Sequence, residues 1–280
     1  MRNIHVEDIT NAVKKLCIEA NYYLPKDVYD ALEAGKQREV SPVGKSILED
    51  ICVNADIAKN EDIPICQDTG SAVIFVKLGQ EVHVEGGLLK DAINEGVRRG
   101  YTEGYLRKSI VENPLYRKNT GDNTPAIIHY EIVEGDNIEI LVAPKGGGSE
   151  NMSKVYMLKP SDGIEGVKKA VKEAVSLAGP NACLPVVVGI GIGGNFEKST
   201  LLAKTALTRH VGSHNEDPRM KALEEELLQE INAMGIGPQG LGGKVTALAV
   251  HIETYPCHIA SMPLAINMGC HVNRHQSVVL

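Results

Sequence analysis

The chain contains no long hydrophobic run. Its longest apolar stretches, such as residues 184–192, are far shorter than the about 20 residues that a transmembrane helix requires. The first seven residues, Met1-Arg-Asn-Ile-His-Val-Glu7, also lack the apolar core of a signal peptide. We therefore expect a cytoplasmic protein with no membrane partner.

Runs of basic residues are absent as well. The formal net charge is −7 at pH 7 and the isoelectric point is about 5.7, which argues against nucleic acid as the main ligand. A local basic pocket for an anionic metabolite is compatible with this balance. The 280 residues, 43% hydrophobic and 23% charged, are typical of an ordinary globular protein with a sizeable core.

Closely spaced cysteine pairs are also missing. The six cysteines are separated by long and irregular intervals, at Cys17, Cys52, Cys66, Cys183, Cys257 and Cys270. A structural zinc site would show C-x2-C pairs, and a secreted disulfide scaffold would be short and dense in cysteine. The pattern therefore indicates free thiols or ligands of another metal centre.

The first sixty residues are predicted to be helical. Apolar residues recur there at i, i+3, i+4 and i+7, in two stripes: Val13, Leu16, Cys17 and Ala20, then Ile47, Leu48, Ile51 and Cys52. Cys17 and Cys52 lie on these stripes. Since buried cysteine behaves as a small hydrophobe, we assign both to the core.

A region rich in predicted strands follows. Residues 72–78 alternate loosely, and residues 127–133 and 137–142 flank Glu134-Gly135-Asp136 in the manner of a hairpin. Helices are expected over residues 88–99 and 105–111.

The middle of the chain is patterned more sharply. An apolar stripe over residues 164–178 predicts a helix that is stopped by Gly179 and Pro180, and residues 184–190 read as a fully buried strand. Asp217-Pro218 predicts the start of a further helix that ends at Gly235. We predict a mixed α and β (α+β) fold: one compact domain over residues 1–280, with a helical segment at about 1–60 and helices packed around small sheets.

Three cysteines lie in turns marked by glycine or proline: Pro64-Ile-Cys66-Gln-Asp-Thr-Gly70, Pro180-Asn-Ala-Cys183-Leu-Pro185 and Asn267-Met-Gly-Cys270-His271. Three thiolates without a fourth can hold a [4Fe-4S] cluster whose last iron stays open as a Lewis acid. Cys257-His258, in a rigid segment between two prolines, competes with Cys270-His271 for the last ligand place. The residues alone leave that choice open.

The segment after Pro64 places a thiol, an amide and a carboxylate on consecutive residues, Cys66, Gln67 and Asp68. Consecutive side chains share no face of a helix or strand, so only a turn would direct all three to one point. The functional interpretation makes Cys66 an iron ligand and gives Gln67 and Asp68 contacts with a substrate. A polar turn before a strand is the alternative.

Two further segments are rich in turn formers. Residues 119–125, Asn-Thr-Gly-Asp-Asn-Thr-Pro, favour a surface loop, with Arg107 and Arg117 upstream as candidate partners for a carboxylate. Residues 144–152, Pro-Lys-Gly-Gly-Gly-Ser-Glu-Asn-Met, form either a flexible turn or an anion-binding nest of backbone N–H groups. No nucleotide P-loop motif follows.

Gly189-Ile-Gly191-Ile-Gly193-Gly194 formally matches the dinucleotide fingerprint G-x-G-x-x-G. No preceding βαβ unit is evident, and Glu216 supplies only loosely the acidic residue expected downstream. We therefore favour glycines that pack a helix against a strand over an NAD site.

Taken together, these motifs resemble the α subunit of the class I, iron–sulfur-dependent fumarate hydratases and of the related L(+)-tartrate dehydratases. The resemblance runs from about Ser41 to Leu280 and is carried by Cys-Gln-Asp-Thr-Gly, Lys-Asn-Thr-Gly-Asp-Asn-Thr-Pro, Pro-Lys-Gly-Gly-Gly-Ser-Glu-Asn and Gly-Ile-Gly-Ile-Gly-Gly, in that order. It implies a [4Fe-4S] cofactor held by Cys66, Cys183 and Cys270, which leaves Cys257 a structural or supporting role.

The resemblance also implies the substrate contacts. Gln67 and Asp68, Arg107, the backbone N–H of Gly147 and His258 correspond to the family's substrate-binding residues, with Asp68 and His258 as catalytic groups that handle the proton. Single-chain members of the family carry a second domain. We therefore expect this chain to be active only with a β subunit, in an assembly such as α2β2.

The expected reaction is the interconversion of fumarate and (S)-malate, with dehydration of L(+)-tartrate as the alternative. A more remote alternative is a non-catalytic iron–sulfur binding or sensor protein, in which a fourth protein ligand would close the cluster.

Overall fold

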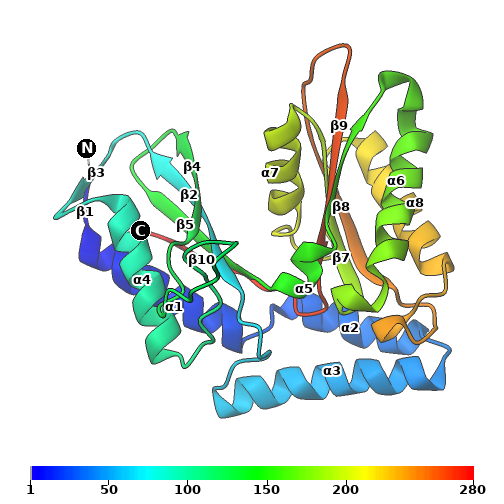
Figure 1. The fold of residues 1–280 in the computed structure, drawn as a ribbon, viewed down its shortest axis with the longest axis horizontal. Helices are drawn as coiled ribbons and strands as arrows, with labels where there is room; N and C mark the ends of the chain where they lie inside the picture. Colours follow the sequence, from blue (N-terminus) through cyan, green and yellow to red (C-terminus); the bar gives the residue numbers. More distant parts are fainter. Residues whose placement is uncertain (1) are drawn as a thin grey trace. The chain divides into compact units, whose positions relative to one another are not determined.

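The computed structural model describes residues 2–280, and three helices follow its short first strand. After β1 (Arg2–His5) come α1 (Val6–Tyr22), α2 (Lys26–Arg38) and α3 (Pro42–Glu61) (Figure 1). The stripe cysteines lie on their buried faces: Cys17 is 0% exposed and Cys52 is 3% exposed. The assignment of both thiols to the core is therefore confirmed, and burial raises the pKa of each thiol to about 12.

The chain forms two compact units, each built from separated parts of the sequence. The first unit comprises residues 2–24, 57–147 and 274–280, and the second comprises residues 25–56 and 148–273. The division falls inside α3, between Asp56 and Ile57. The mixed α and β class is confirmed, whereas a single domain over residues 1–280 stays a prediction.

The first unit contains a four-stranded sheet in the order β10-β5-β2-β4 and a small parallel pair of β1 with β3 (Val82–Glu85). The four strands are β2 (Ser71–Gly79), β4 (Ile127–Val133), β5 (Ile138–Lys145) and β10 (Gln276–Val279). α1 packs against α4 (Leu89–Glu103), which confirms the helix expected near residues 88–99. Alternate residues of β5, such as Ile138, Ile140 and Val142, are fully buried in the core beneath these helices.

The predicted hairpin of residues 127–133 and 137–142 is wrong. β2 lies between these two strands, parallel to β4 and antiparallel to β5. The end of β2 fits inside the turn, because the N–H groups of Gly79, Gln80 and Glu81 donate to the carbonyls of Asn137, Val133 and Gly135. A Cβ on Gly79 would lie 2.5 Å from the Gly135 oxygen, so only glycine allows this insertion.

The predicted helix over residues 105–111 is also wrong. Tyr105 has a left-handed φ of 50°, which breaks the helix immediately after α4, and the segment continues without regular structure up to an isolated bridge between Val111 and Asn119. Its backbone is instead held by a distant side chain, because the N–H of Ser109 donates to Asn123 Oδ1 at 2.7 Å.

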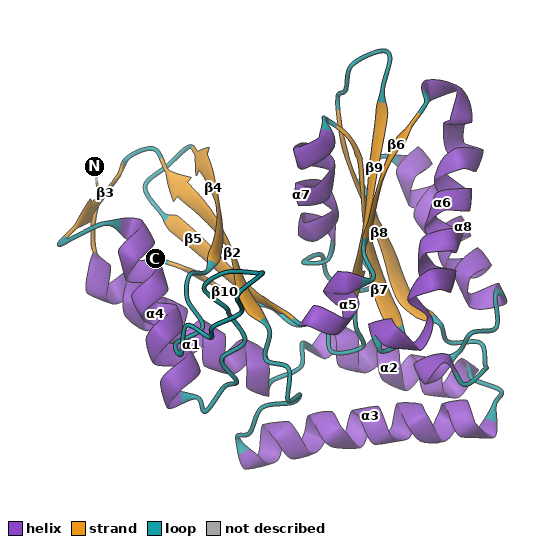
Figure 2. Ribbon diagram, viewed as in Figure 1, coloured by secondary structure: helices purple, strands orange, loops and turns teal. Residues whose placement is uncertain are grey.

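The second unit contains a sheet in the order β6-β9-β7-β8. Its strands are β6 (Lys154–Leu158), β7 (Val186–Gly193), β8 (Ala247–Tyr255) and β9 (Met262–Gly269). α7 (Phe196–Ala206) covers one face, while α6 (Gly163–Ala178) and α8 (Pro218–Ala233) cover the other (Figure 2). α6 and the strand near residues 184–190 are confirmed, and α8 starts as predicted, because Asp217 accepts a hydrogen bond from the N–H of Arg219.

Short helical segments complete the chain: α5 (Gly147–Asn151) and the 3-10 turns Pro160–Asp162, Gly179–Ala182 and Pro238–Gly240. α5 follows β5 after a single residue, so much of the predicted glycine loop is helical. Within residues 2–280, no helix combines the length and the apolar character needed to cross a membrane.

Gly189 and Gly191, within the 189–194 motif, serve helix packing. Gly189, Gly191 and Gly193 belong to strand β7 itself, not to a turn after it. A Cβ on Gly189 would lie 2.3 Å from the Ala203 oxygen, and one on Gly191 would lie 2.0 Å from the Ser199 oxygen. These two glycines therefore let the backbone of α7 approach β7 closely. This agrees with the packing role that we favoured over a dinucleotide-binding turn.

Candidate metal centre and substrate site

Two of the three predicted cluster cysteines lie at the same end of the sheet in the second unit. Cys183 follows a 3-10 turn just before β7, and Cys270 follows the last residue of β9. β7 and β9 are antiparallel with Val187 opposite Gly269, so the start of one strand lies beside the end of the other. The register therefore brings the two turns together although 87 positions separate them in the chain.

A hydrogen-bonded residue joins these turns. The backbone N–H of His271 donates to the Cys183 carbonyl at 3.2 Å, and His271 Nδ1 lies 2.9 Å from the same oxygen. The Cys183 side chain is exposed and Cys270 is half-buried, and neither cysteine forms a disulfide.

The third predicted ligand, Cys66, belongs to the first unit. Residues 62–70 form no helix or strand, as the turn interpretation requires. The Cys66 thiol is half-buried and donates to Gln67 Oε1 at 3.2 Å. Among residues 2–280, no group of three or more His, Cys, Asp or Glu side chains is close enough to hold a metal ion. The donor set nevertheless fits an iron–sulfur cluster chemically, because all three are accessible thiols outside any disulfide.

The Asp68 carboxylate organises the glycine-rich segment beside it. Asp68 Oδ1 accepts the N–H of Gly70 at 3.1 Å, and Oδ2 accepts the N–H of Gly147 at 2.8 Å. Two of the predicted substrate-binding groups, Asp68 and the Gly147 N–H, are thus hydrogen-bonded to each other. Their direct contact supports a common location and shows how the Cys66 loop is tied to the start of α5.

Backbone contacts bring Arg107 to the same loop. The Thr69 hydroxyl donates to the Arg107 carbonyl at 3.0 Å, while the Arg107 side chain is exposed. Tyr101, fully buried on α4, donates its hydroxyl to the carbonyls of Thr69 and Gly70 at 2.8 and 3.1 Å. Arg107, Gln67 and Asp68 therefore lie on one supported loop region of the first unit.

Two residues that support the Cys66–Gly70 loop were not predicted from the sequence. Arg274 is only 5% exposed and donates from Nη2 to the Asp68 carbonyl at 2.7 Å. Asn123, expected in a surface loop, is fully buried and donates to the Gly70 carbonyl at 3.1 Å. The only signal for Arg274 was its position four residues after Cys270, and an isolated arginine more often lies on the surface.

His258 and Cys257 lie at the opposite end of the second unit's sheet from Cys183 and Cys270. They follow Tyr255, which pairs with Gly193 at the far end of β7. The eight residues of β7 span roughly 23 Å at about 3.3 Å per residue. His258 is therefore separated from Cys183 and Cys270 by about the length of this strand.

His258 and Cys257 instead border a separate open pocket of about 490 Å³. It is also lined by Gly194, Asn195, Lys198, Tyr255 and Pro256. The Lys198 ammonium lies over the Tyr255 ring, 4.8 Å from its centroid. The substrate contact of His258 stays a prediction.

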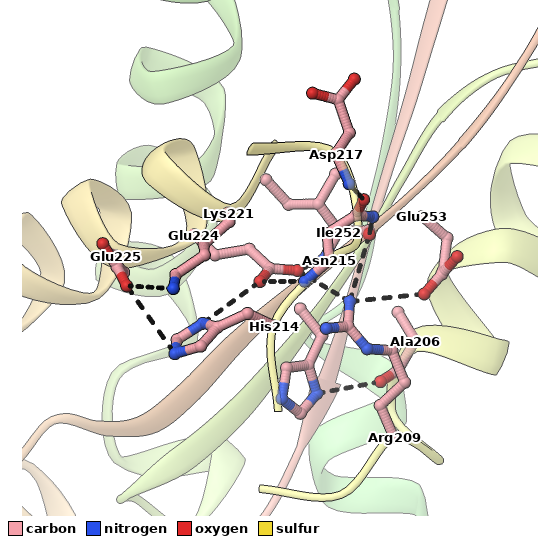
Figure 3. A network of polar contacts seen from close by, with 11 residues as sticks. Ala206, Arg209, His214, Asn215, Asp217, Lys221, Glu224, Glu225, Ile252 and Glu253 are labelled. Atoms are coloured by element: carbon pink, nitrogen blue, oxygen red, sulfur yellow. Dashed lines mark hydrogen bonds and ion pairs between the residues drawn. The ribbon is translucent and has the colours of Figure 1, made fainter. Parts of the chain in front are cut away.

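A buried ion pair forms the centre of a polar network elsewhere in the second unit (Figure 3). Arg209 Nη1 lies 2.7 Å from Glu224 Oε1, and Glu224 also accepts the N–H groups of Ile252 and Asn215 at 2.8 and 3.0 Å. Glu224 is 1% exposed, so these charged hydrogen bonds offset its desolvation. The network ties the start of α8 and the segment after α7 to β8, and we assign it a structural role.

The stability of the fold is expected to depend on pH through His251, which lies in β8 beside this network. It is 1% exposed, and burial together with the positive charge of Arg209 lowers its pKa to about 4. The unfolded state, with an ordinary histidine pKa of about 6.5, takes up a proton that the folded state excludes, so stability falls as the pH falls. We expect His251 to account for a loss of about 2 kcal/mol in unfolding free energy between about pH 7 and pH 5.

Urea unfolding of wild type and His251→Asn at both pH values tests this. Asparagine keeps an N–H donor for the Ala206 carbonyl, which lies 3.1 Å from His251 Nδ1, and removes the titrating ring. The variant should lose less stability than wild type on acidification. An equal loss in both proteins would refute the assignment.

Comparison with known proteins gives consistent matches over nearly the whole chain. A family model described as "Fumarate hydratase (Fumerase)" matches residues 10–279. A protein of Methanocaldococcus jannaschii named "Putative L(+)-tartrate dehydratase subunit alpha" is 44% identical over 273 residues, which cover 95% of each chain. The L(+)-tartrate dehydratase subunit alpha of Shigella sonnei is 34% identical over 278 residues, covering 98% of this chain and 91% of the relative.

Proposed function

The chain belongs to the class I fumarase and L(+)-tartrate dehydratase α-subunit family, and we propose that it forms the α subunit of an iron–sulfur hydro-lyase acting on a hydroxy-dicarboxylate. The observation that carries the proposal is 44% identity over 95% of both chains to a relative named for tartrate dehydratase. L(+)-tartrate is accordingly the first candidate substrate. This reverses the order expected from the sequence, where fumarate and (S)-malate came first.

Cys66, Cys183 and Cys270 are the residues that would hold the cluster. A [4Fe-4S] cluster with one iron free of protein ligands supplies a Lewis acid that weakens the C–O bond of the departing hydroxyl. The accessible thiols of all three residues support this assignment. We assign Cys257 no ligand role, because it lies at the far end of the sheet from Cys183 and Cys270.

The first unit provides the groups that bind and orient the substrate. The exposed guanidinium of Arg107 offers a two-pronged donor to a carboxylate, and the exposed amide of Gln67 offers a further hydrogen bond. Asp68, held by two backbone N–H groups, would accept or return a proton at the substrate hydroxyl. Fixing the substrate between such groups removes part of the entropic barrier to reaction.

A β subunit would complete the site, and assembly as α2β2 is part of the proposal. The relatives are named as α subunits, which supports a second chain. The β subunit would supply the base that removes the proton from the carbon next to the hydroxyl-bearing carbon. We therefore expect little or no turnover by the α chain alone.

Turnover of the two substrates by the assembled enzyme tests the proposal. The chain would be purified anaerobically together with its β subunit, and kcat/KM compared for L(+)-tartrate and (S)-malate. A site that hydrogen-bonds the second hydroxyl of tartrate should favour tartrate by ~100-fold or more, since malate leaves those polar groups unpaired.

(S)-Malate is the second candidate because the matching family model is described as fumarate hydratase. Preference for malate would establish that alternative. Dehydration of neither substrate by an iron-loaded pair would refute the proposed function. The cluster-loaded α chain without its partner serves as the control for the role of the β subunit.

A further inference from the structure

The backbone around Cys183 is fixed by side chains from distant parts of the second unit. The Cys183 carbonyl receives the backbone N–H of His271 at 3.2 Å, and His271 Nδ1 lies 2.9 Å from it. A carbonyl oxygen only accepts hydrogen bonds, so we assign the ring proton to Nδ1. In this tautomer the imidazole donates to the Cys183 carbonyl.

The next carbonyl along the chain is held in the same manner. The Leu184 oxygen accepts the backbone N–H of Gln239 at 3.2 Å and its side-chain Nε2 at 2.7 Å. Gln239 Nε2 also lies 3.3 Å from His271 Nδ1, so the two clamping side chains are in contact. Two consecutive peptide groups are thus fixed from two separate segments of the chain.

Cys183 requires such support because its own conformation is unfavourable. It has a left-handed φ of 55°, which side chains other than glycine rarely adopt. Locally, its N–H donates to the Pro180 carbonyl at 3.0 Å. The orientation of the Cys183 carbonyl is coupled to the direction of the Cys183 Cβ, and therefore to the direction of its exposed thiol.

We propose that His271 is a positioning residue that holds the Cys183 thiol ready for the cluster and fixes its turn relative to Cys270. The inference rests on the proposed function. His271 is bonded covalently to Cys270 and by hydrogen bonds to Cys183, so one residue sets the spacing of two ligand turns. Ligands ordered before binding lose less conformational freedom when the cluster binds, which slows its loss.

Loss of the cluster to an iron chelator measures this effect directly. The full-length chain would be loaded anaerobically with iron and sulfide, and the rate of cluster bleaching followed in wild type, His271→Leu and His271→Asn. Leucine has no donor, whereas asparagine places an N–H at about the position of Nδ1. We expect about 10-fold faster loss in His271→Leu, corresponding to about 1.4 kcal/mol, and substantial rescue in His271→Asn.

Controls separate positioning from folding. His210→Leu removes an exposed histidine of the same unit and should leave the rate unchanged. Gln239→Leu removes the second clamp and keeps the His271 side chain, and we expect it to accelerate cluster loss as well. It therefore tests the clamp in a second variant should His271→Leu fail to fold. Circular dichroism and the melting temperature of each apo chain would show that the fold is retained.

The outcomes are distinct. A wild-type chain that retains its cluster, with His271→Leu and Gln239→Leu equally retentive, would overturn the positioning role and leave the proposed function intact. Equal acceleration in His271→Asn and His271→Leu would also overturn it, because the donated hydrogen bond would then be irrelevant. A wild-type chain that takes up no cluster would overturn both proposals.

Discussion

Replacing Cys183 with serine is expected to abolish retention of a [4Fe-4S] cluster, and Cys66→Ser and Cys270→Ser should do the same. With three protein ligands, each thiolate holds a different iron, so the loss of one leaves two irons without a protein ligand. Iron and sulfide counting after anaerobic reconstitution, together with EPR after mild oxidation, measures the effect. The expected change is from a full cluster to background.

Cys257→Ser is the matched control. Its thiol is exposed, as that of Cys183 is, but it lies at the other end of the sheet and should leave the cluster unchanged. If Cys257→Ser lost the cluster and Cys270→Ser kept it, the roles assigned to Cys257 and Cys270 would be exchanged. Loss in all four variants would instead support a closed cluster and the non-catalytic alternative.

The two core cysteines provide an internal comparison. Burial raises the thiol pKa of Cys17 and Cys52 to about 12, so neither should react with iodoacetamide in the folded chain. The four remaining cysteines are at least partly accessible and should be labelled in the apo chain. Protection of Cys66, Cys183 and Cys270, but not of Cys257, after loading would identify the ligands independently of activity.

Replacing Gly191 with alanine is expected to destabilise the second unit severely. The new Cβ would lie 2.0 Å from the Ser199 oxygen and 2.6 Å from the Ala203 nitrogen, both in the backbone of α7. No rotamer change relieves a clash with backbone, so α7 must move away from the sheet that it covers. Overpacking of this kind costs about 3 kcal/mol or more, which would appear as a lower midpoint in urea unfolding.

Gly87→Ala is the control for this prediction. A Cβ there would meet its nearest neighbour, Val6 Cγ1, at 3.7 Å, an ordinary van der Waals contact. Its unfolding midpoint should stay near that of wild type. An unchanged midpoint for Gly191→Ala would show that α7 is not packed tightly on β7 and would reopen the question of what these glycines do.

Local signals in the sequence predicted most helices correctly. The stripe of α6 and the Asp217-Pro218 start of α8 depend on contacts within about four residues, and the structure confirms both. The glycine motif was also correctly assigned to helix packing, which Gly189 and Gly191 provide. By contrast, Glu134-Gly135-Asp136 looked like a hairpin turn, yet the end of β2, more than fifty residues earlier, occupies it.

The candidate site likewise contains residues that the sequence predicted and residues that only the structure revealed. Residue types and motif order predicted Cys66, Gln67, Asp68 and Arg107 as candidate site residues, and all four lie on neighbouring loops of the first unit. The support from Arg274, Asn123 and His271 was invisible in the sequence, because each contact joins residues at least 50 positions apart. The distance of His258 from Cys183 and Cys270 likewise follows only from strand direction.

The sequence by itself determined the family and most of the helices, because motif order and short-range periodicity are written along the chain. The tertiary structure alone decided the order of the strands, the burial of Asn123 and Arg274, and the meeting of the Cys183 and Cys270 turns. These depend on strand register and on burial, which arise when distant segments exclude water together. No window of neighbouring residues contains that information.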